Sequence, residues 1–420
     1  MKPNFVRAFI VVAVSALVLL RGELRGAEWY KGQLHCHSVW SDGNVLPELA
    51  IGWYKDHGYH FMSLTDHNVL QLDPNKWKEV AEPIIAESKQ KFGPDWVETK
   101  EENGKTLVHL KTFAELAQKL NEADKFLLIP GHEQNTSVAG FSLHANAINI
   151  TESIPFPKDF PSVAAAALNW RSASLANSAK SGLEGYWILN HPDWPYYDNS
   201  PEVLIEASDV EFYENNMSGG PRKRQTQMPD REKYWDIVLA FRHLAGAKPI
   251  YFVTTDDTHN YLTFRDGVAN PGLGWVVVRS EKLDANSLFR AMKKGDFYSS
   301  NGVVLKDVRF DSGTKTLTVD VDPAEGVKYT IRFIGTKKGF GTNKEPFEIP
   351  AEEKLAARKG FTYSDQIGVT FLTVEGTTAS YKMSPDDLYV RAVITSDKSP
   401  KYKGQNAPDK ETAWTQPVGW

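Results

Sequence analysis

The stretch QLHCHSVWSDG, Gln33 to Gly43, decides how the rest of the chain is interpreted. His35 and His37 lie one residue apart, and successive side chains of a strand point to opposite faces, so the two imidazoles share a face. Cys36, the only cysteine in the chain, points to the other face and is interpreted as a small buried apolar residue. Two imidazoles on one face can chelate one cation, with metal–nitrogen distances of ~2.0–2.1 Å. Taken alone, the pattern fits a structural histidine pair equally well.

Other segments place the same residue types at the end of an apolar strand pattern. They are YHFMSLTDHN, FLLIPGHE, GYWILNHPDW and PIYFVTTDDTHN, with FSLHANAINI as a possible neighbouring strand. The strands alternate with helical patterns, which predicts parallel βα units. Polar residues at the C-terminal ends of such strands are where barrel enzymes hold their active sites. Four histidines lie in helical or loop contexts and are interpreted as structural: His57, His60, His109 and His243.

In this order, HCHSVWSDG, SLTDHN, PGHE, NHP and TDDTH resemble the motifs of the PHP (polymerase and histidinol phosphatase) superfamily. The resemblance covers roughly Trp29 to Gly302. The apolar N-terminus and the segments GDFYSSNG and AWTQPV are similar to a secreted branch of that superfamily, the carbaryl-type carbamate hydrolases. The resemblance implies a distorted (βα)7 barrel, similar to a TIM barrel, with up to three divalent metals at the strand ends. Amidohydrolase barrels also open with H-x-H, but they need a bridging lysine and a lone late aspartate.

The resemblance also assigns the metal ligands, motif by motif. The first metal would be held by His35, His37, Glu133 and Asp257. Glu133 would bridge to a second metal completed by His144 and His191, and a third would be held by Asp42, His67 and His259. A metal-bound hydroxide at Glu133, with Asp257 and His259 nearby, would be the attacking group. Mixed histidine and carboxylate ligation fits Zn²⁺, Mn²⁺ or Fe²⁺, and the sequence does not choose among them.

The charge balance of such a centre indicates its substrate. Three divalent cations bring about six positive charges, and Asp42, Glu133 and Asp257 return only three, so the site attracts anionic groups such as phosphate. We therefore predict a hydrolase acting on an anionic small molecule, with phosphoester cleavage first. Hydrolysis of a carbamate, amide or carboxyl ester is the alternative. An inactive metal-binding surface protein is the second alternative, although none of the expected ligands is missing.

Several other residues have predicted roles near this centre. Asp66 directly precedes a ligand and is expected to accept the ring N–H of a ligand histidine or to form a structural hydrogen bond. Glu211, Glu214 and Asn215, in the strand pattern VEFYENN, either line the cleft or form salt bridges or caps. The predicted substrate contacts are Arg265, Arg222, Arg224, Asn260 and Tyr261, the arginines because guanidinium groups pair with phosphate.

The composition and the N-terminus limit the class of protein. The chain has 420 residues, 41% hydrophobic and 24% charged, with a net charge of −5. This is ordinary globular composition, and without a block of basic residues no nucleic-acid partner is expected. Lys2 and Arg7 flank the start of an apolar run, Ala8 to Leu20, that is typical of a signal peptide. We expect export to the periplasm or beyond the cell, with no membrane span after cleavage. An uncleaved anchor is the alternative.

The expected organisation has three parts. Residues 1–27 form the signal peptide, and residues 28–302 form the barrel, with insertions near 75–125 and 153–181. The first insertion is charged and helical in pattern, and the second contains an alanine-rich segment that is expected to be a helix. Residues 303–420 form an all-β, sandwich-like domain, because VRFDSGTKTLTVDVD reads as a hairpin and KYTIRFIG and DLYVRAVITS alternate like half-buried strands. That domain caps the barrel or binds a glycan or another partner. The oligomeric state is left open.

Overall fold

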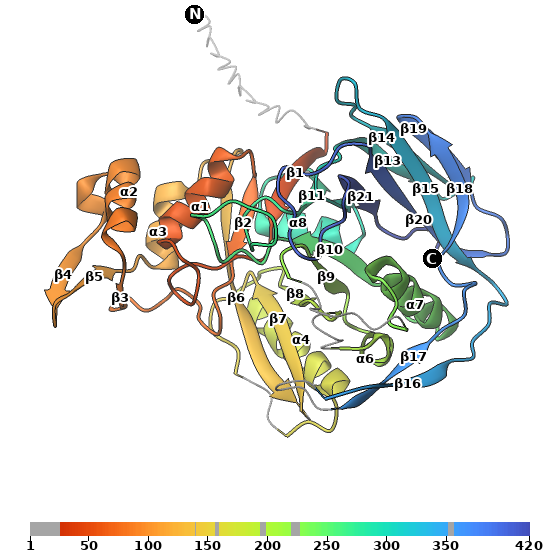
Figure 1. The fold of residues 1–420 in the computed structure, drawn as a ribbon, viewed down its shortest axis with the longest axis horizontal. Helices are drawn as coiled ribbons and strands as arrows, with labels where there is room; N and C mark the ends of the chain where they lie inside the picture. The colour runs from red at the N-terminus through yellow and green to blue at the C-terminus, as the bar shows by residue number, and fades with distance from the viewer. Residues whose placement is uncertain (1–25, 139, 156–158, 194–198, 220–226, 352–356) are drawn as a thin grey trace, which may run out of the picture.

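A computed structural model gives the fold of the protein (Figure 1). It describes residues 26–138, 140–155, 159–193, 199–219, 227–351 and 357–420. Nearly all of the predicted signal peptide lies outside the described residues, and so do Arg222 and Arg224. Across the described ranges, none of the helices combines the length and apolar character that a bilayer crossing requires.

One large mixed sheet organises the described chain. In order across the sheet, its strands are β10 (Tyr251–Thr255), β9 (Phe212–Asn216), β8 (Tyr186–Leu189), β7 (Phe141–Ile148), β6 (Leu127–Val138), β2 (Phe61–Leu64), β1 (Glu28–Gln33), β11 (Trp275–Ser280), β12 (Phe297–Ser300), β21 (Thr412–Thr415), β20 (Asp387–Ser396), β15 (Tyr329–Lys337) and β18 (Val369–Glu375). The pairs β1/β2, β2/β6, β8/β9 and β9/β10 are parallel. Strands β2 and β8 are buried along their whole length, as strands covered on both faces are.

The expected closed barrel is not confirmed, because this sheet is open. Strand β7 runs antiparallel to both β6 and β8. Only two residues separate β6 from β7, and a parallel pair needs a crossover of a dozen residues or more. Beyond the sheet, the chain that follows β1 meets the chain that follows β10 at an isolated parallel bridge between Cys36 and Thr258. The two ends of the parallel strand series therefore meet at this bridge.

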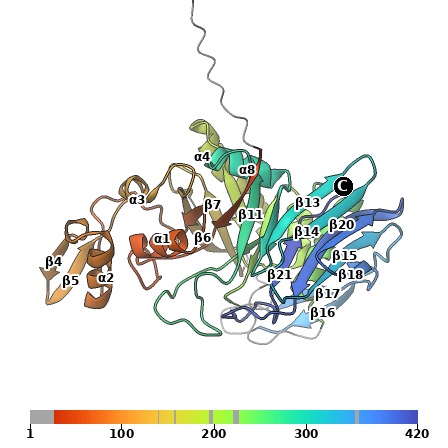
Figure 2. The same ribbon diagram turned by 90° about the horizontal axis from the view of Figure 1, so that it is seen from above.

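Most of the described helices flank the main sheet, whereas α2 (Glu82–Phe92) lies apart from it (Figures 1 and 2). The others are α1 (Pro47–Asp56), α3 (Phe113–Leu120), α4 (Val163–Lys180), α6 (Pro201–Glu206), α7 (Arg231–Leu244) and α8 (Ala285–Lys293), with a 3₁₀ turn at Pro94–Trp96. Helix α1 ends next to Gly58, which has a φ of 73°. Helix α3 begins with a capping box of Thr112 and Glu115, and α4 is the predicted alanine-rich helix.

The insertion near residues 75–125 differs from the prediction, which saw a helical pattern there. Besides α2 and α3 it contains a three-stranded antiparallel sheet of β3 (Trp77–Glu79), β5 (Lys105–His109) and β4 (Thr99–Glu102). The turn between β4 and β5 is Asn103–Gly104, with φ angles of 52° and 73°. An Asn-Gly pair favours a tight hairpin turn because both residues tolerate positive φ. The charged residues around Asn103 and Gly104 favoured the helical prediction over this hairpin signal.

The predicted all-β character of the C-terminal part is confirmed over its described residues. Strands β13 (Leu305–Asp311), β14 (Thr316–Val321) and β19 (Thr378–Lys382) form one small sheet. Strands β16 (Glu345–Ile349) and β17 (Arg358–Thr362) form a second. The remaining strands, β21, β20, β15 and β18, extend the main sheet through pairing of β21 with β12. The backbone ladder thus continues from the N-terminal strands into the C-terminal ones (Figure 2).

A buried ion pair also joins the C-terminal strands to α7. Arg391 of β20 is fully buried, and its Nε and Nη2 donate to Asp236 of α7 at 3.0 and 2.6 Å. The Tyr389 hydroxyl donates to the same carboxylate at 2.8 Å. The Arg391 guanidinium also lies 4.8 Å from the Trp235 ring centroid. Each charge therefore depends on the other to compensate for its lost hydration.

Replacing Arg391 should therefore be strongly destabilising. Arg391→Met leaves Asp236 buried without its cation, and we expect the free energy of unfolding to fall by roughly 3–5 kcal/mol. Arg309→Met is the matched control, because Arg309 pairs with Asp307 and Asp320 but its side chain is 54% exposed; its expected cost is below about 1 kcal/mol. Urea unfolding measures both. Equal, small losses for the two variants would contradict the assigned role of the buried pair.

Candidate metal centre

All nine predicted ligands lie together near the ends of the parallel strands. They form three groups in which ligand atoms lie within 4.8 Å of one another: the first is His35, His37 and Asp257, the second is Glu133, His144 and His191, and the third is His37, Asp42, His67 and His259. His37 belongs to two of the groups. Residues separated by more than two hundred positions in the sequence are thus brought to one place by the sheet.

The first group is built by the chain that follows β1. The amide of Asp257 donates to the His35 carbonyl at 3.0 Å, and the amide of His37 donates to the Thr258 carbonyl at 2.9 Å. These bonds keep the segment extended, so both imidazoles face the same side and their Nε2 atoms lie 3.2 Å apart. Both rings are fully buried. Cys36 points the other way, with its Sγ 3.4 Å from the Ser63 carbonyl.

The distances within the first group fit a bound cation. Oδ1 of Asp257 lies 3.2 Å from the Nε2 atoms of both His35 and His37. Oε2 of Glu133 lies 3.4 and 3.5 Å from the same two nitrogens. A tetrahedron with metal–ligand bonds of ~2.0–2.1 Å has edges of about 3.3 Å. The five separations given among these four ligand atoms are therefore close to the edges of such a tetrahedron.

Glu133 of β6 connects the first group to the second. Its Oε2 faces His35 and His37, and its Oε1 lies 3.4 Å from His144 Nδ1 and 3.6 Å from His191 Nε2. The amide of Asn190 donates to Oε1 at 2.9 Å and fixes the carboxylate. The side chain of Glu133 is 1% exposed. The geometry thus suits a carboxylate shared between two cations.

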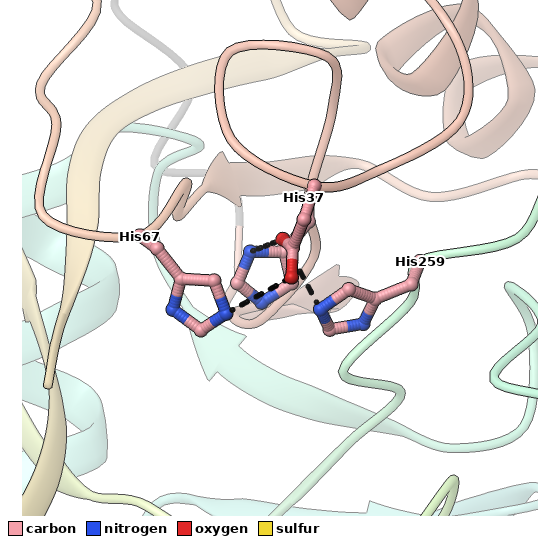
Figure 3. A group of neighbouring side chains, drawn as sticks. His37, His67 and His259 are labelled. Carbon is pink, nitrogen blue, oxygen red and sulfur yellow. Dashed lines mark ion pairs between the residues drawn. The ribbon is translucent and has the colours of Figure 1, made fainter.

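The third group forms the open edge of the centre. Oδ2 of Asp42 lies 3.5 Å from His67 Nε2, and Oδ1 lies 3.4 Å from His259 Nε2. His37 Nδ1 is 3.8 Å from Asp42 Oδ1. Figure 3 shows the rings of His37, His67 and His259 gathered around this point. The Asp42 side chain is 55% exposed, whereas His35 and His37 are fully buried, so the centre opens to solvent on the Asp42 side.

Two of the predicted ligands have an unusual backbone conformation. His191 has a φ of 26° and Asp257 a φ of 49°. Positive φ is uncommon for residues with a side chain and costs of order 1–3 kcal/mol where it is enforced. Hydrogen bonds hold both positions: the amide of His191 donates to Glu214 at 2.8 Å, and the amide of Asp257 donates to His35. Strain of this kind is concentrated at functional sites, which supports a functional centre here.

The charges of the cluster are strongly coupled. Burial works against protonation of His35, but Glu214 and the other nearby carboxylates outweigh it and raise the pKa of His35 well above its usual value. Burial also works against ionisation of Glu133, but His35 holds its pKa well below normal. Burial and the neighbouring His259 lower the pKa of His37 to about 4. Ionised carboxylates buried beside a neutral imidazole favour a cation, and a metal would displace the protons.

Sequence reasoning left one important residue, Glu214, without a definite role. Glu214 lies on β9, its Oε1 is 2.5 Å from His35 Nδ1, and the Thr255 hydroxyl also donates to it. Farther out, Asn216 donates to Asp257 Oδ2 at 2.9 Å. Partners of this kind fix the orientation of ligand side chains. The signal was the run Glu214-Asn215-Asn216 at a strand end, but no spacing rule shows which ligand each residue contacts.

Asp66 contacts the loop before Asp42. Its carboxylate accepts from the amide and hydroxyl of Ser38 at 2.8 and 2.9 Å, and from the Ser41 hydroxyl at 2.8 Å. Burial raises the pKa of Asp66 to about 6, against these hydrogen bonds. The contacts fix the loop that carries Asp42 toward His67 and His259.

The predicted substrate contacts have mixed placements. Tyr261 is buried in the core beside Cys36, so it does not present its ring to the centre, and we withdraw it as a contact. Oδ1 of Asn260 accepts from the amides of Leu262 and Thr263 at 3.0 and 2.8 Å and caps a turn. Arg265 is exposed on the same loop.

Comparison with known proteins finds only solved structures of low identity and low TM-score. Neither a scan of family models nor a search of curated proteins gives a match. Among solved structures, a two-domain protein from Bacteroides vulgatus, containing a predicted PHP-like metal-dependent phosphoesterase, has 16% identity and a TM-score of 0.40, covering 94% of this chain and 96% of that one.

Two more solved structures match part of the chain. A candidate metal-dependent phosphoesterase from Bifidobacterium adolescentis has 15% identity and a TM-score of 0.29, covering 54% of this chain and 87% of its own. An amidohydrolase from Chromobacterium violaceum with bound sulfate and no metal has 14% identity and a TM-score of 0.27, covering 55% and 87%. At these TM-scores, the function has to be argued from the geometry of the centre.

Removing the charge of Glu214 should weaken metal binding. In Glu214→Gln the acceptor that orients His35 loses its negative charge, and we expect the affinity for Zn²⁺ to fall by roughly 10–100-fold. Glu211→Gln is the control, because Glu211 lies just before the same strand and pairs with Arg171. Competition against a chromophoric chelator measures both affinities. Unchanged affinity in Glu214→Gln would show that this contact does not support the centre.

Proposed function

We propose that the chain is a metal-dependent hydrolase and, more specifically, a phosphoesterase. The observation that carries this proposal is the position of Glu133, a buried carboxylate whose two oxygens face two different groups of ligand atoms. Divalent ions held at such neighbouring groups would lower the pKa of water toward ~7 and offset charge on the attacked centre. Zn²⁺, Mn²⁺ and Fe²⁺ all suit this mixture of imidazole and carboxylate ligands.

The centre has a buried side and a side that is open to solvent, and the side chains on the two sides have different roles. His35, His37 and Glu133 form the buried side and exclude bulk water there. Asp42 and His259 are partly exposed, so a substrate would approach from their side. A reacting group that enters there meets fixed, desolvated ligands, and electrostatic effects are stronger in such a site than in water.

The charge around the open side favours an anionic substrate. Three divalent ions would outnumber the three carboxylates Asp42, Glu133 and Asp257 in charge. A protein cation also lies nearby: Lys78 of β3 donates to the carbonyl of Ser41, next to Asp42, at 3.2 Å. A phosphate group would satisfy this excess of positive charge more fully than a neutral ester or carbamate. With the apolar N-terminal run as an export signal, the substrate would be met outside the cytoplasm.

An activity panel tests the proposal. We expect metal-loaded protein to hydrolyse 4-nitrophenyl phosphate or its bis-ester faster than 4-nitrophenyl acetate or a 4-nitrophenyl carbamate. Chelation should abolish this activity and added Zn²⁺ or Mn²⁺ should restore it. Glu133→Gln should lower kcat at least about 100-fold, because it weakens two ligand groups at once. Absorbance of released nitrophenolate reports every rate.

The control variant is His109→Gln, because His109 lies in the small sheet of the insertion, where it stacks on Trp77. It should keep wild-type rates. Faster turnover of the acetate or the carbamate would replace the phosphoesterase assignment with the carbon-centred one. A fully metal-loaded protein without turnover on any of the four compounds would contradict the proposal as a whole.

A further inference from the structure

A second cavity lies away from the metal centre. It has a volume of about 560 Å³, and none of the nine candidate metal ligands lines it. Its walls come from the end of α1, from the loop that leads into β11, from the chain that follows β12 and from the chain that precedes β21. In Figure 2 the green loop that precedes β11 lies between α1 and the C-terminal strands. The volume is within the ~300–1,000 Å³ range of small-molecule sites.

One side of the cavity is a row of aromatic rings. The rings of His57 and Trp53 stack at 3.8 Å with an interplanar angle of 11°. Phe264 follows, 6.3 Å from Trp53 and inclined by 22°, and then Tyr402, 5.8 Å from Phe264. Gly272, with a φ of 86°, makes room for this row, because a Cβ there would lie 2.9 Å from the Trp53 ring. We call these four rings the aromatic row.

Asn301 adds a buried hydrogen-bond donor to the lining of the cavity. Asn301 lines the cavity and is 4% exposed. Its Oδ1 accepts from the Thr412 amide at 2.6 Å, which fixes the orientation of the side-chain amide. Its Nδ2 is buried and has no hydrogen-bond partner within the described part of the chain. A buried donor without an acceptor is costly, and a bound oxygen would satisfy it.

The rim of the cavity adds charged groups. Glu411 lines it with a side chain that is 14% exposed and pairs with Lys398 at 3.2 Å. Lys401 also lines it and lies 5.2 Å from the Tyr402 ring centroid. A carboxylate and an ammonium group can accept and donate hydrogen bonds at the edge of a ring bound on the aromatic row. An apolar ligand would leave Nδ2 of Asn301 without a partner.

From these contacts we propose that the cavity binds a saccharide of one or two pyranose rings. A pyranose has a flat face of C–H groups, which packs on aromatic rings, and an edge of hydroxyl groups, which both donate and accept hydrogen bonds. The aromatic row would take the C–H face. Nδ2 of Asn301 would donate to a ring or hydroxyl oxygen, and Glu411 would accept from a hydroxyl group.

Saturation-transfer NMR and calorimetry on the full chain test this inference. The probes are cellobiose, maltose and di-N-acetylchitobiose, and we expect at least one to bind. Trp53→Ala should weaken that binding about tenfold or more. Asn301→Asp keeps an acceptor for the Thr412 amide but removes the donor, and it should also weaken binding severalfold. Trp77→Ala is the matched control, because Trp77 lies on β3 outside the cavity, and its affinity should equal that of the wild type.

Tyr402→Ala provides a second aromatic variant in a loop if Trp53→Ala does not fold, and it should also weaken binding. The inference is overturned if none of the three saccharides binds at millimolar concentration. It is equally overturned if one binds and neither the aromatic variants nor Asn301→Asp changes its affinity. Binding of an apolar dye, 1-anilinonaphthalene-8-sulfonate, that the saccharides cannot displace would assign the cavity to an apolar ligand instead. These outcomes are independent of the phosphoesterase assay.

Discussion

The burial of carboxylates among imidazoles at the strand ends is the constraint on which the rest of the structure depends. Glu133 is almost wholly inaccessible, and an ionised carboxylate in such a place is unfavourable without compensating charge. His35 and Asn190 provide part of this compensation. The remaining need for positive charge is what divalent cations would satisfy. The charge and the geometry of the centre therefore suit bound divalent cations, and hydrogen bonds between its side chains keep the ligands in position.

The fold assembles this centre through the direction of its strands. Parallel strands bring their C-terminal ends to one edge, and the bridge between Cys36 and Thr258 brings the chain after β1 beside the chain after β10. His35 and Asp257 can then approach the same point although more than two hundred residues separate them in the sequence. The strained backbone at Asp257 and His191 is held by neighbouring hydrogen bonds, so the ligand geometry is set by the scaffold.

Much of the centre could be predicted from the sequence, because alternation and strand ends are local rules. The one-apart spacing of His35 and His37 correctly gave their shared face and the position of Cys36 on the opposite, buried face. Strand direction was harder, because nothing in the pattern of β6 and β7 distinguished a tight hairpin from a crossover, so the antiparallel direction of β7 was missed. The closed barrel was expected from the resemblance and not from the pattern of the strands. The contact between Glu214 and His35 depends on which strands are neighbours, and the burial of Tyr261 depends on how its loop packs against the core. Both features are set by tertiary structure, which local sequence patterns do not show.

The measurement that tests the central claim most directly is anomalous diffraction from crystals of the protein loaded with Zn²⁺ or Mn²⁺. The account predicts anomalous peaks on both sides of the Glu133 carboxylate, one beside His35 and His37 and one beside His144 and His191. A map without peaks at Glu133, or with metal only at the protein surface, would contradict the assignment of these residues as one metal centre.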